Sequence, residues 1–307
     1  MVRFIIVRLL QTIVALIGIS LLIFLLVRIS GNPIDLMRTP TSTEEDIANI
    51  KELYGFDKSY AEQYWLFVKG ISHGDFGKSI LRGRPVTEMI LEALPNSIRL
   101  GLTGFSVGML AALLLGVLAA TKRDSWLDNV VKFLAVLGQA LPNFWLAIMS
   151  IFVFAVSLRI LPAYGTAGPL NYVLPAGTLA FFLLPGMMRL VRSSMLDVLD
   201  SEYVKLARIK GLPERIVIWK HALRNALIAP LTVAGLIFAN IITGAVILEN
   251  VFAWPGVGKM SVDSMVARDF PVVQAITLVV AVLVLMVNLF IDIIYAYVDP
   301  QIRYQRT

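Results

Sequence analysis

The sequence contains no cysteine and only two histidines, His73 and His221, in 307 residues. The lack of cysteine excludes a disulfide framework, a cysteine nucleophile and every thiolate metal site. Two histidines are too few for a histidine-rich metal cluster. We therefore expect this chain to hold no metal and no cofactor of its own.

Charged residues are also scarce, at 16% of the chain, whereas 58% of the residues are hydrophobic and the mean hydropathy is +0.78. A soluble domain carries about 25% charged residues. The excess apolar surface is too large for one water-soluble core, which indicates that lipid covers part of it. The net charge of +6 then marks a cytoplasmic membrane face rather than a nucleic-acid partner.

Six segments are apolar over the roughly 20 residues that a helix needs to cross a bilayer. They are Leu9–Val27, Ile98–Ala120, Phe133–Leu158, Tyr172–Leu190, Ala226–Leu248 and Val272–Tyr297. The first run is longer than a signal-peptide core and no Ala-x-Ala site follows it, so we expect it to be retained. The pattern predicts an all-α integral membrane protein. Prolines inside the spans, such as Pro142, are expected to bend them.

The distribution of basic residues predicts the orientation. With the N-terminus inside, the short outer connections hold only Arg159, Lys259 and Arg268, and the inner connections hold most of the other Lys and Arg residues. This bias places both termini in the cytoplasm. Arg189 and Arg192, at the inner end of the fourth span, are expected to contact lipid headgroups.

The chain divides by this topology into an N-terminal span (1–29), an extracytoplasmic loop (30–97) and a five-span core (98–307). The loop has a capping-box spacing at Ser42-x-x-Glu45, and we expect further helices at Tyr60–Ile71 and from Pro85 towards Leu94. Such a helical insertion either packs on the spans as a lid or offers a docking surface to an external partner.

Gly77-Lys78-Ser79 has the ending of a phosphate-binding P-loop, but the glycine required five residues earlier is Ser72. No other stretch of the sequence fits the full motif. We therefore expect the chain not to be an enzyme and not to hydrolyse ATP itself.

A cytoplasmic segment of about residues 192–221 is too long for a tight turn and too short for a domain. Val198, Tyr203, Leu206 and Ile209 are spaced almost as on one helical face, and Gly211 with Pro213 is expected to end that helix. A second helix is expected from Glu214 to Leu223. A short helix that is half apolar and cationic suits either a groove in a soluble partner or the lipid surface.

The residues of this segment resemble a known family. Tyr203-x-x-x-Ala207-Arg208-x-Lys210-Gly211-Leu212-Pro213, followed by His221-Ala-Leu-Arg-Asn-Ala-Leu227, is similar to the coupling loop of binding-protein-dependent ABC permeases, in particular the first permease subunit of the dipeptide, oligopeptide, nickel and glutathione group. Four further segments resemble the same group: Gly74-Asp-Phe-Gly-x-Ser79, Glu249-x-Val-Phe-x-x-Pro255-Gly256-x-Gly258, Arg268-Asp269-x-Pro271 and Asp292-x-x-Tyr295-x-x-x-Asp299-Pro300-x-Ile302-Arg303-Tyr304. One departure is Lys205-Leu206-Ala207, where broader ABC permeases often have Glu-Ala-Ala.

The resemblance implies a type I ABC importer permease in a bacterial inner membrane. This chain would pair with a second, homologous permease subunit, and two cytoplasmic ATPase subunits, which bind ATP and Mg²⁺, would grip the coupling loops. An extracytoplasmic solute-binding protein would deliver peptides or similar small solutes, which cross by alternating access.

Two sets of site residues follow from this resemblance and from polar positions within the spans. In the coupling set, Ala207 and Gly211 are expected to permit close approach of the ATPase. That set is Glu202, Tyr203, Leu206, Ala207, Arg208, Lys210, Gly211, Leu212 and Pro213. The candidates for the translocation path or its gate are Asn240, Thr243, Glu249, Pro255, Gly256, Asn288 and Asp292. Asp292 has a second interpretation, as the partner of a basic residue.

A secondary transporter or channel without ATPase partners is the main alternative. It requires ion-coupling charges deep in the membrane and often inverted repeats, and the sequence has few central charges and no clear repeat. A membrane enzyme would need a catalytic cluster such as His-Glu-x-x-His, which the sequence lacks.

Overall fold

The computed structural model describes residues 2–30, 43–44, 57–239, 241 and 245–298. The described residues are mostly helical, and their only extended pairing is one isolated bridge between Lys78 and Pro85. Four helices are long and apolar enough to cross a membrane, and two bent helix pairs raise the number to six if each pair is one span. The prediction of an all-α membrane protein with about six spans is confirmed.

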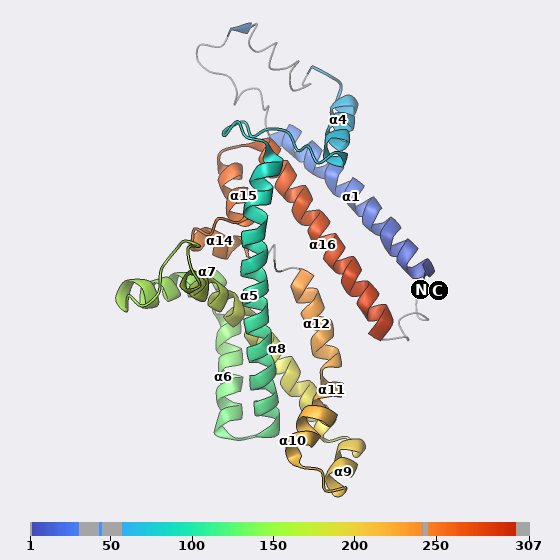
Figure 1. The fold of residues 1–307 in the computed structure, drawn as a ribbon, viewed down its shortest axis with the longest axis vertical. Helices are drawn as coiled ribbons and strands as arrows, with labels where there is room; N and C mark the ends of the chain where they lie inside the picture. Colours follow the sequence, from blue (N-terminus) through green and yellow to red (C-terminus); the bar gives the residue numbers. More distant parts are fainter. Residues whose placement is uncertain (1, 31–42, 45–56, 240, 242–244, 299–307) are drawn as a thin grey trace. The chain divides into compact units, whose positions relative to one another are not determined.

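The chain forms two compact units, which we describe separately (Figure 1). The first unit comprises residues 1–96 and 256–307, and the second comprises residues 97–255. Helix α5 (Val86–Thr121) begins in the first unit and continues into the second.

The first unit is built on the pairing of α1 (Val2–Ser30) with α16 (Phe270–Val298), which lie side by side (Figure 1). An ion pair joins them, with Arg8 Nη1 3.0 Å from Asp292 Oδ2. Most large apolar side chains on the other faces of α1 are exposed, as expected for a helix covered by lipid. Helix α15 (Val257–Val266) packs on α16.

Helix α4 (Tyr60–Ser72) confirms the helix that the sequence predicts over Tyr60–Ile71. Its start is a capping box: the Ser59 hydroxyl accepts from the Glu62 backbone N–H, and the Glu62 carboxylate accepts from the Ser59 backbone N–H. Hydrogen bonds from the Ser59 side chain and then its backbone lower the pKa of Glu62. The other predicted box, at Ser42 and Glu45, lies outside the described residues.

Two of the motifs noted in the sequence, those that contain Ser79 and Asp269, meet through Asp269, which is almost fully buried. Its carboxylate accepts hydrogen bonds from the Ser79 hydroxyl at 2.5 Å, the Ile80 backbone N–H at 3.1 Å and the Leu81 backbone N–H at 3.4 Å. The carboxylate therefore fastens the turn after Gly77 to the start of α16.

Replacing Asp269 with alanine is expected to destabilise the first unit by about 1–3 kcal/mol, because three donors lose their acceptor. The measurement is the midpoint temperature at which the purified protein aggregates. Asp263→Ala is the control, since Asp263 pairs with Lys259 on a partly exposed surface and such pairs contribute about 0–1 kcal/mol. Equal midpoints for the two variants would contradict the role given to Asp269.

In the second unit, α5 and α8 (Leu170–Leu199) pack closely because small residues recur on α5. A Cβ atom added at Gly108 would lie 2.9 Å from the Ala180 carbonyl oxygen, and one at Gly116 would lie 2.8 Å from Val191 Cβ. Gly104 and Ala112 complete a series with a small residue at every fourth position, a pattern that lets membrane helices approach. The sequence predicted two helices between Pro85 and Ala120, but the chain forms one, with Pro95 inside it.

The third predicted span is broken rather than bent. Helix α6 (Trp126–Ala140) and the next helical segment, α7 (Asn143–Ser150) followed by the π-helix η1 (Ile151–Ser157), meet at 105°. Pro142 disfavours the helical conformation of the residue before it, and Leu141 is extended. A milder bend of 54° separates residues 214–226 from α12 (Ile228–Ala239).

Candidate functional site

The segment that resembles a coupling loop consists of short helices at one end of the second unit (Figure 1). Helix α8 ends at Leu199, and α9 (Glu202–Ile209) follows after two residues, so the single helix expected to carry Val198 and Ile209 is interrupted. After Pro213 come α10 (Glu214–Ile216), the π-helix η2 (Val217–Ala222) and α11 (Leu223–Ala226). The predicted second helix therefore exists, with a π-helical middle.

Helix α9 has one face buried in the unit and one face exposed. Val204 and Ala207 are 0% and 7% exposed, whereas Leu206 and Ile209 are 54% and 79% exposed. The buried pair belongs to a core cluster shared with the ends of α5 and α8 and with the helices that lead to α12. Its members are Val117, Ala120, Val191, Met195, Val204, Ala207, Val217, Ala222, Leu223 and Ala226. Helix α9 is therefore packed directly on the ends of the long helices.

The burial of Ala207 corrects one expectation. Its small side chain faces the core cluster of this chain, so its size serves internal packing rather than the approach of a partner. The exposed apolar side chains are instead Tyr203, Leu206 and Ile209, together with Ile216.

Gly211 closes α9 in a Schellman motif. The Leu212 N–H donates to the Ala207 carbonyl at 3.3 Å, and the Gly211 N–H donates to the Arg208 carbonyl at 2.9 Å. The motif needs a left-handed residue, and Gly211 has φ +74°. Leu212 completes it by packing against the core cluster. The predicted stop at Gly211 is confirmed.

Polar contacts tie α9 to the helices that follow it. The Tyr203 hydroxyl accepts from Asn225 Nδ2 at 2.8 Å, so the two halves of the loop motif touch. Arg208 donates to both carboxylate oxygens of Glu214, at 2.7 and 3.2 Å, and this hydrogen bonding raises the pKa of Arg208. Three further members of the predicted coupling set, Glu202, Lys210 and Pro213, are exposed.

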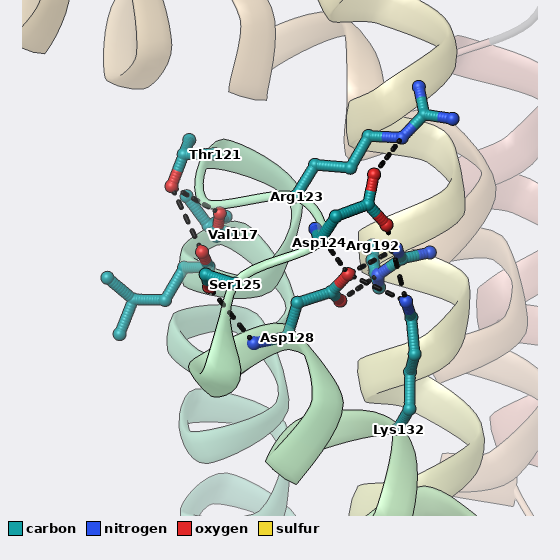
Figure 2. A network of polar contacts seen from close by, with 9 residues as sticks. Val117, Thr121, Arg123, Asp124, Ser125, Asp128, Lys132 and Arg192 are labelled. Atoms are coloured by element: carbon teal, nitrogen blue, oxygen red, sulfur yellow. Dashed lines mark hydrogen bonds and ion pairs between the residues drawn. The ribbon is translucent and has the colours of Figure 1, made fainter.

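A charge network centred on a buried carboxylate joins α6 to α8, and the sequence did not reveal it (Figure 2). Asp128, on α6, is fully buried and accepts two hydrogen bonds from Arg192 on α8, at 2.6 and 2.8 Å. Lys132 Nζ lies 2.8 Å from the same carboxylate, and the Asp124 N–H donates to it at 3.0 Å. The expectation that Arg192 contacts headgroups is therefore wrong. Two features of the sequence could have pointed to Asp128 as part of a network. They are the helix-cap spacing of Ser125 and Asp128 and the four-residue spacing of Asp128 and Lys132.

The predicted path residues do not form one cluster within either unit. In the second unit, Glu249 is fully buried and accepts a 2.5 Å hydrogen bond from the Ser97 hydroxyl, while Pro255 is exposed. In the first unit, Asp292 pairs with Arg8, which fits its second interpretation.

The remaining path candidates take different places. Gly256 is buried at the start of α15, and Asn288 is half-buried on α16. Asn240 and Thr243 lie outside the described residues. A pocket of about 520 Å³ lies between α6, α8 and α12 in the second unit. The sequence analysis placed no path residue on α6 or α8.

The described helices thus define an all-α integral membrane protein. Two family models match the chain: "Binding-protein-dependent transport system inner membrane component" over residues 112–304, and its N-terminal counterpart over residues 1–101. The chain therefore belongs to the binding-protein-dependent permeases of ABC transport systems. These are inner-membrane permease subunits that work with a solute-binding protein and ATPases.

Relatives match over nearly the whole chain. The oligopeptide transport system permease protein AppB of Bacillus subtilis (strain 168) is 39% identical, over 99% of this chain and all of its own length. The dipeptide permease DppB of Alkalihalophilus pseudofirmus (strain ATCC BAA-2126 / JCM 17055 / OF4) is 35% identical over 97% of this chain and 98% of its own. The glutathione permease GsiC of Salmonella choleraesuis (strain SC-B67) is 36% identical over 99% of this chain and all of its own length.

The fold has a counterpart among solved structures. An amino acid ABC transporter, crystallised with histidines, matches 69% of this chain and 94% of its own with a TM-score of 0.55 and 14% identity. This similarity supports the type I permease fold that the sequence predicted.

Proposed function

We propose that this chain is one of two permease subunits of an ATP-driven importer for peptides or similar small solutes. Helix α9 carries the proposal, because it exposes an apolar face while its other face is packed on the ends of the long helices. The names of the relatives, which transport oligopeptides, dipeptides and glutathione, support the class of cargo.

The assembly in this proposal has four kinds of partner. A cytoplasmic ATPase receives α9 in a groove, by the helix-in-groove mode of recognition. A second, homologous permease completes the path, lipid covers the apolar faces such as that of α1, and an external binding protein delivers cargo. ATP and Mg²⁺ belong to the ATPase pair.

Packing explains how ATP-driven motion would reach the membrane. When the ATPases close, they displace α9, and the core cluster passes this displacement to α5, α8 and α11, because close-packed side chains transmit strain. The Tyr203–Asn225 and Arg208–Glu214 contacts hold the loop together during that displacement. The spans then exchange inward-open and outward-open packings, which is alternating access.

The same proposal sets the topology. Residues 1–29 form the first span, 30–97 the extracytoplasmic insertion and 98–307 the core, with both termini in the cytoplasm. The basic residues around α9 support this orientation. Buried Glu249, held by Ser97, is a candidate hinge of the outer gate, and Asn240, Thr243 and Asn288 are further candidates for the path.

Purifying the complex through a tag on this chain tests the proposal. We expect a second permease and ATP-hydrolysing subunits to copurify. Leu206→Glu should remove the ATPase but keep the second permease, because it places a charge on the exposed apolar face of α9.

The control for this experiment is Val266→Glu at the end of α15, since Val266 is an apolar residue that is even more exposed than Leu206. It should leave the complex intact. Recovery of the chain without any ATPase would favour a secondary transporter or channel, and retention of the ATPase by Leu206→Glu would contradict docking through α9.

A further inference from the structure

Helix α8 carries an unusual exposed stripe. It is the most enclosed of the four long membrane helices, with 61% of its apolar window buried. Yet Phe182, Gly186, Arg189 and Ser193 are all exposed, and their spacing of four, three and four residues places them on one face. A lipid-facing stripe is apolar, whereas this one becomes polar towards its inner end, which indicates contact with water.

The stripe borders the pocket of about 520 Å³ between α6, α8 and α12. Phe182 and Gly186 line the pocket from α8, and Gln139 lines it from α6. Apolar walls with one polar group are typical of a site that binds a small solute. Arg189 lies next to this lining, because its Nη1 donates to Gln139 Oε1 at 3.3 Å.

The two arginines of α8 differ in how their charge is compensated. Arg192 donates two hydrogen bonds to the buried Asp128 carboxylate, which neutralises it inside the protein. Arg189 donates one hydrogen bond to a neutral amide and forms no ion pair with any residue that the structure describes. A guanidinium has five donors, so Arg189 keeps both its charge and a fork for another acceptor. Such a fork matches the two oxygens of a carboxylate.

We propose that Arg189, oriented by Gln139, binds the carboxylate of the cargo as it passes through the membrane. This inference rests on the proposed function, since it assigns part of the translocation path to α6 and α8. The ligand is a small solute with a free carboxylate, such as the C-terminus of a peptide. A path site must bind weakly enough to release its solute, and one exposed guanidinium meets that requirement.

The first test measures the water access and the local charge of the stripe, and it needs no transport. The chain has no cysteine, so Gly186→Cys introduces its only thiol, and a Cβ atom there meets no atom within 4 Å. We expect this thiol, in the purified complex, to react about tenfold faster with an anionic than with a cationic methanethiosulfonate reagent. Adding Arg189→Gln should remove this preference.

Leu22→Cys is the control, since Leu22 is an exposed apolar residue of α1 that we expect lipid to cover. It should react slowly with both reagents. A thiol at position 186 that reacts as slowly as this control, or a preference that persists after Arg189→Gln, would overturn the inference.

The second test compares uptake of a dipeptide, Ala-Ala, with that of its C-terminal amide by reconstituted complexes whose binding protein is saturated. Arg189→Gln should reduce the rate for the free acid about tenfold, because a hydrogen-bonded pair of charged groups is stronger than a pair of neutral ones. The rate for the amide should change less than twofold. Arg189→Lys should recover part of the loss, because it restores the charge but not the fork.

Failure of the role given to Arg189 can be distinguished from failure of the proposed function. Equal losses for both peptides, or no loss for the free acid, would overturn the role of Arg189. A wild-type complex that transports neither peptide would contradict the peptide cargo of the proposed function, and the thiol experiment would still decide whether the stripe faces water.

Discussion

Replacing Gly211 with valine is expected to reduce solute uptake at least about tenfold while ATP hydrolysis continues. Gly211 has φ +74°, a conformation that costs an L-residue about 1–2 kcal/mol, and more for a β-branched one. The substitution opens the Schellman motif that holds Leu212 against the core cluster. Helix α9 then loses its fixed attachment, so the ATPase moves it without moving the spans.

Gly211→Asn is the matched variant, since asparagine tolerates the left-handed conformation better than other residues with a side chain. We expect its uptake to remain near that of the wild type. The measurement is the number of solutes transported per ATP hydrolysed in reconstituted vesicles. No atom lies within 4 Å of a Cβ atom at this position, so crowding inside the chain explains neither result.

The pair of variants also separates two explanations of why a glycine is needed at position 211. If both asparagine and valine uncouple transport, the position needs room for the ATPase, as the sequence first indicated. If valine alone uncouples it, the backbone conformation is the reason. Unchanged uptake with valine would contradict any role of this turn in coupling.

Asp128→Ala is expected to destabilise the protein by about 3 kcal/mol, because it leaves Arg192 in a largely enclosed place without its partner. We choose the lower end of the range for a broken buried pair, since Lys132 is exposed and regains water. The midpoint temperature of aggregation should fall by several degrees in detergent.

Two further variants control this experiment. Asp124→Asn should change the midpoint little, because Asp124 forms ion pairs only at the exposed surface and asparagine tolerates the φ of +60° at this position. Adding Arg192→Met to Asp128→Ala should recover part of the loss, since it removes the unpaired charge. A double variant no more stable than Asp128→Ala alone would contradict the assignment of the loss to Arg192.

Local signals in the sequence were enough to predict that the coupling loop contains helix α9 and where that helix ends. Gly211 and Pro213 marked the end of α9, and the spacing of apolar residues showed that a helix is present. The side on which this helix packs was not readable in the same way. Tyr203, Leu206 and Ile209 have the larger side chains, but Val204 and Ala207 are the residues that the fold buries.

The path was the least predictable part. Polar residues in the spans were candidates because a buried polar group in a membrane is costly. Asp292 and Glu249 turned out to be held by Arg8 and by Ser97, whose positions in the sequence are far away. Arg189 was assigned to the lipid surface, although its exposed stripe and its contact with Gln139 place it beside the pocket.

The sequence by itself determined that the protein is an all-α membrane protein and which family it belongs to. These properties depend on composition, run length and short motifs, all of which are local. Only the tertiary structure decided which arginine of α8 is neutralised and which keeps its charge. Both arginines sit in similar local sequence, and the difference comes from Asp128, which a separate helix brings to Arg192 and not to Arg189.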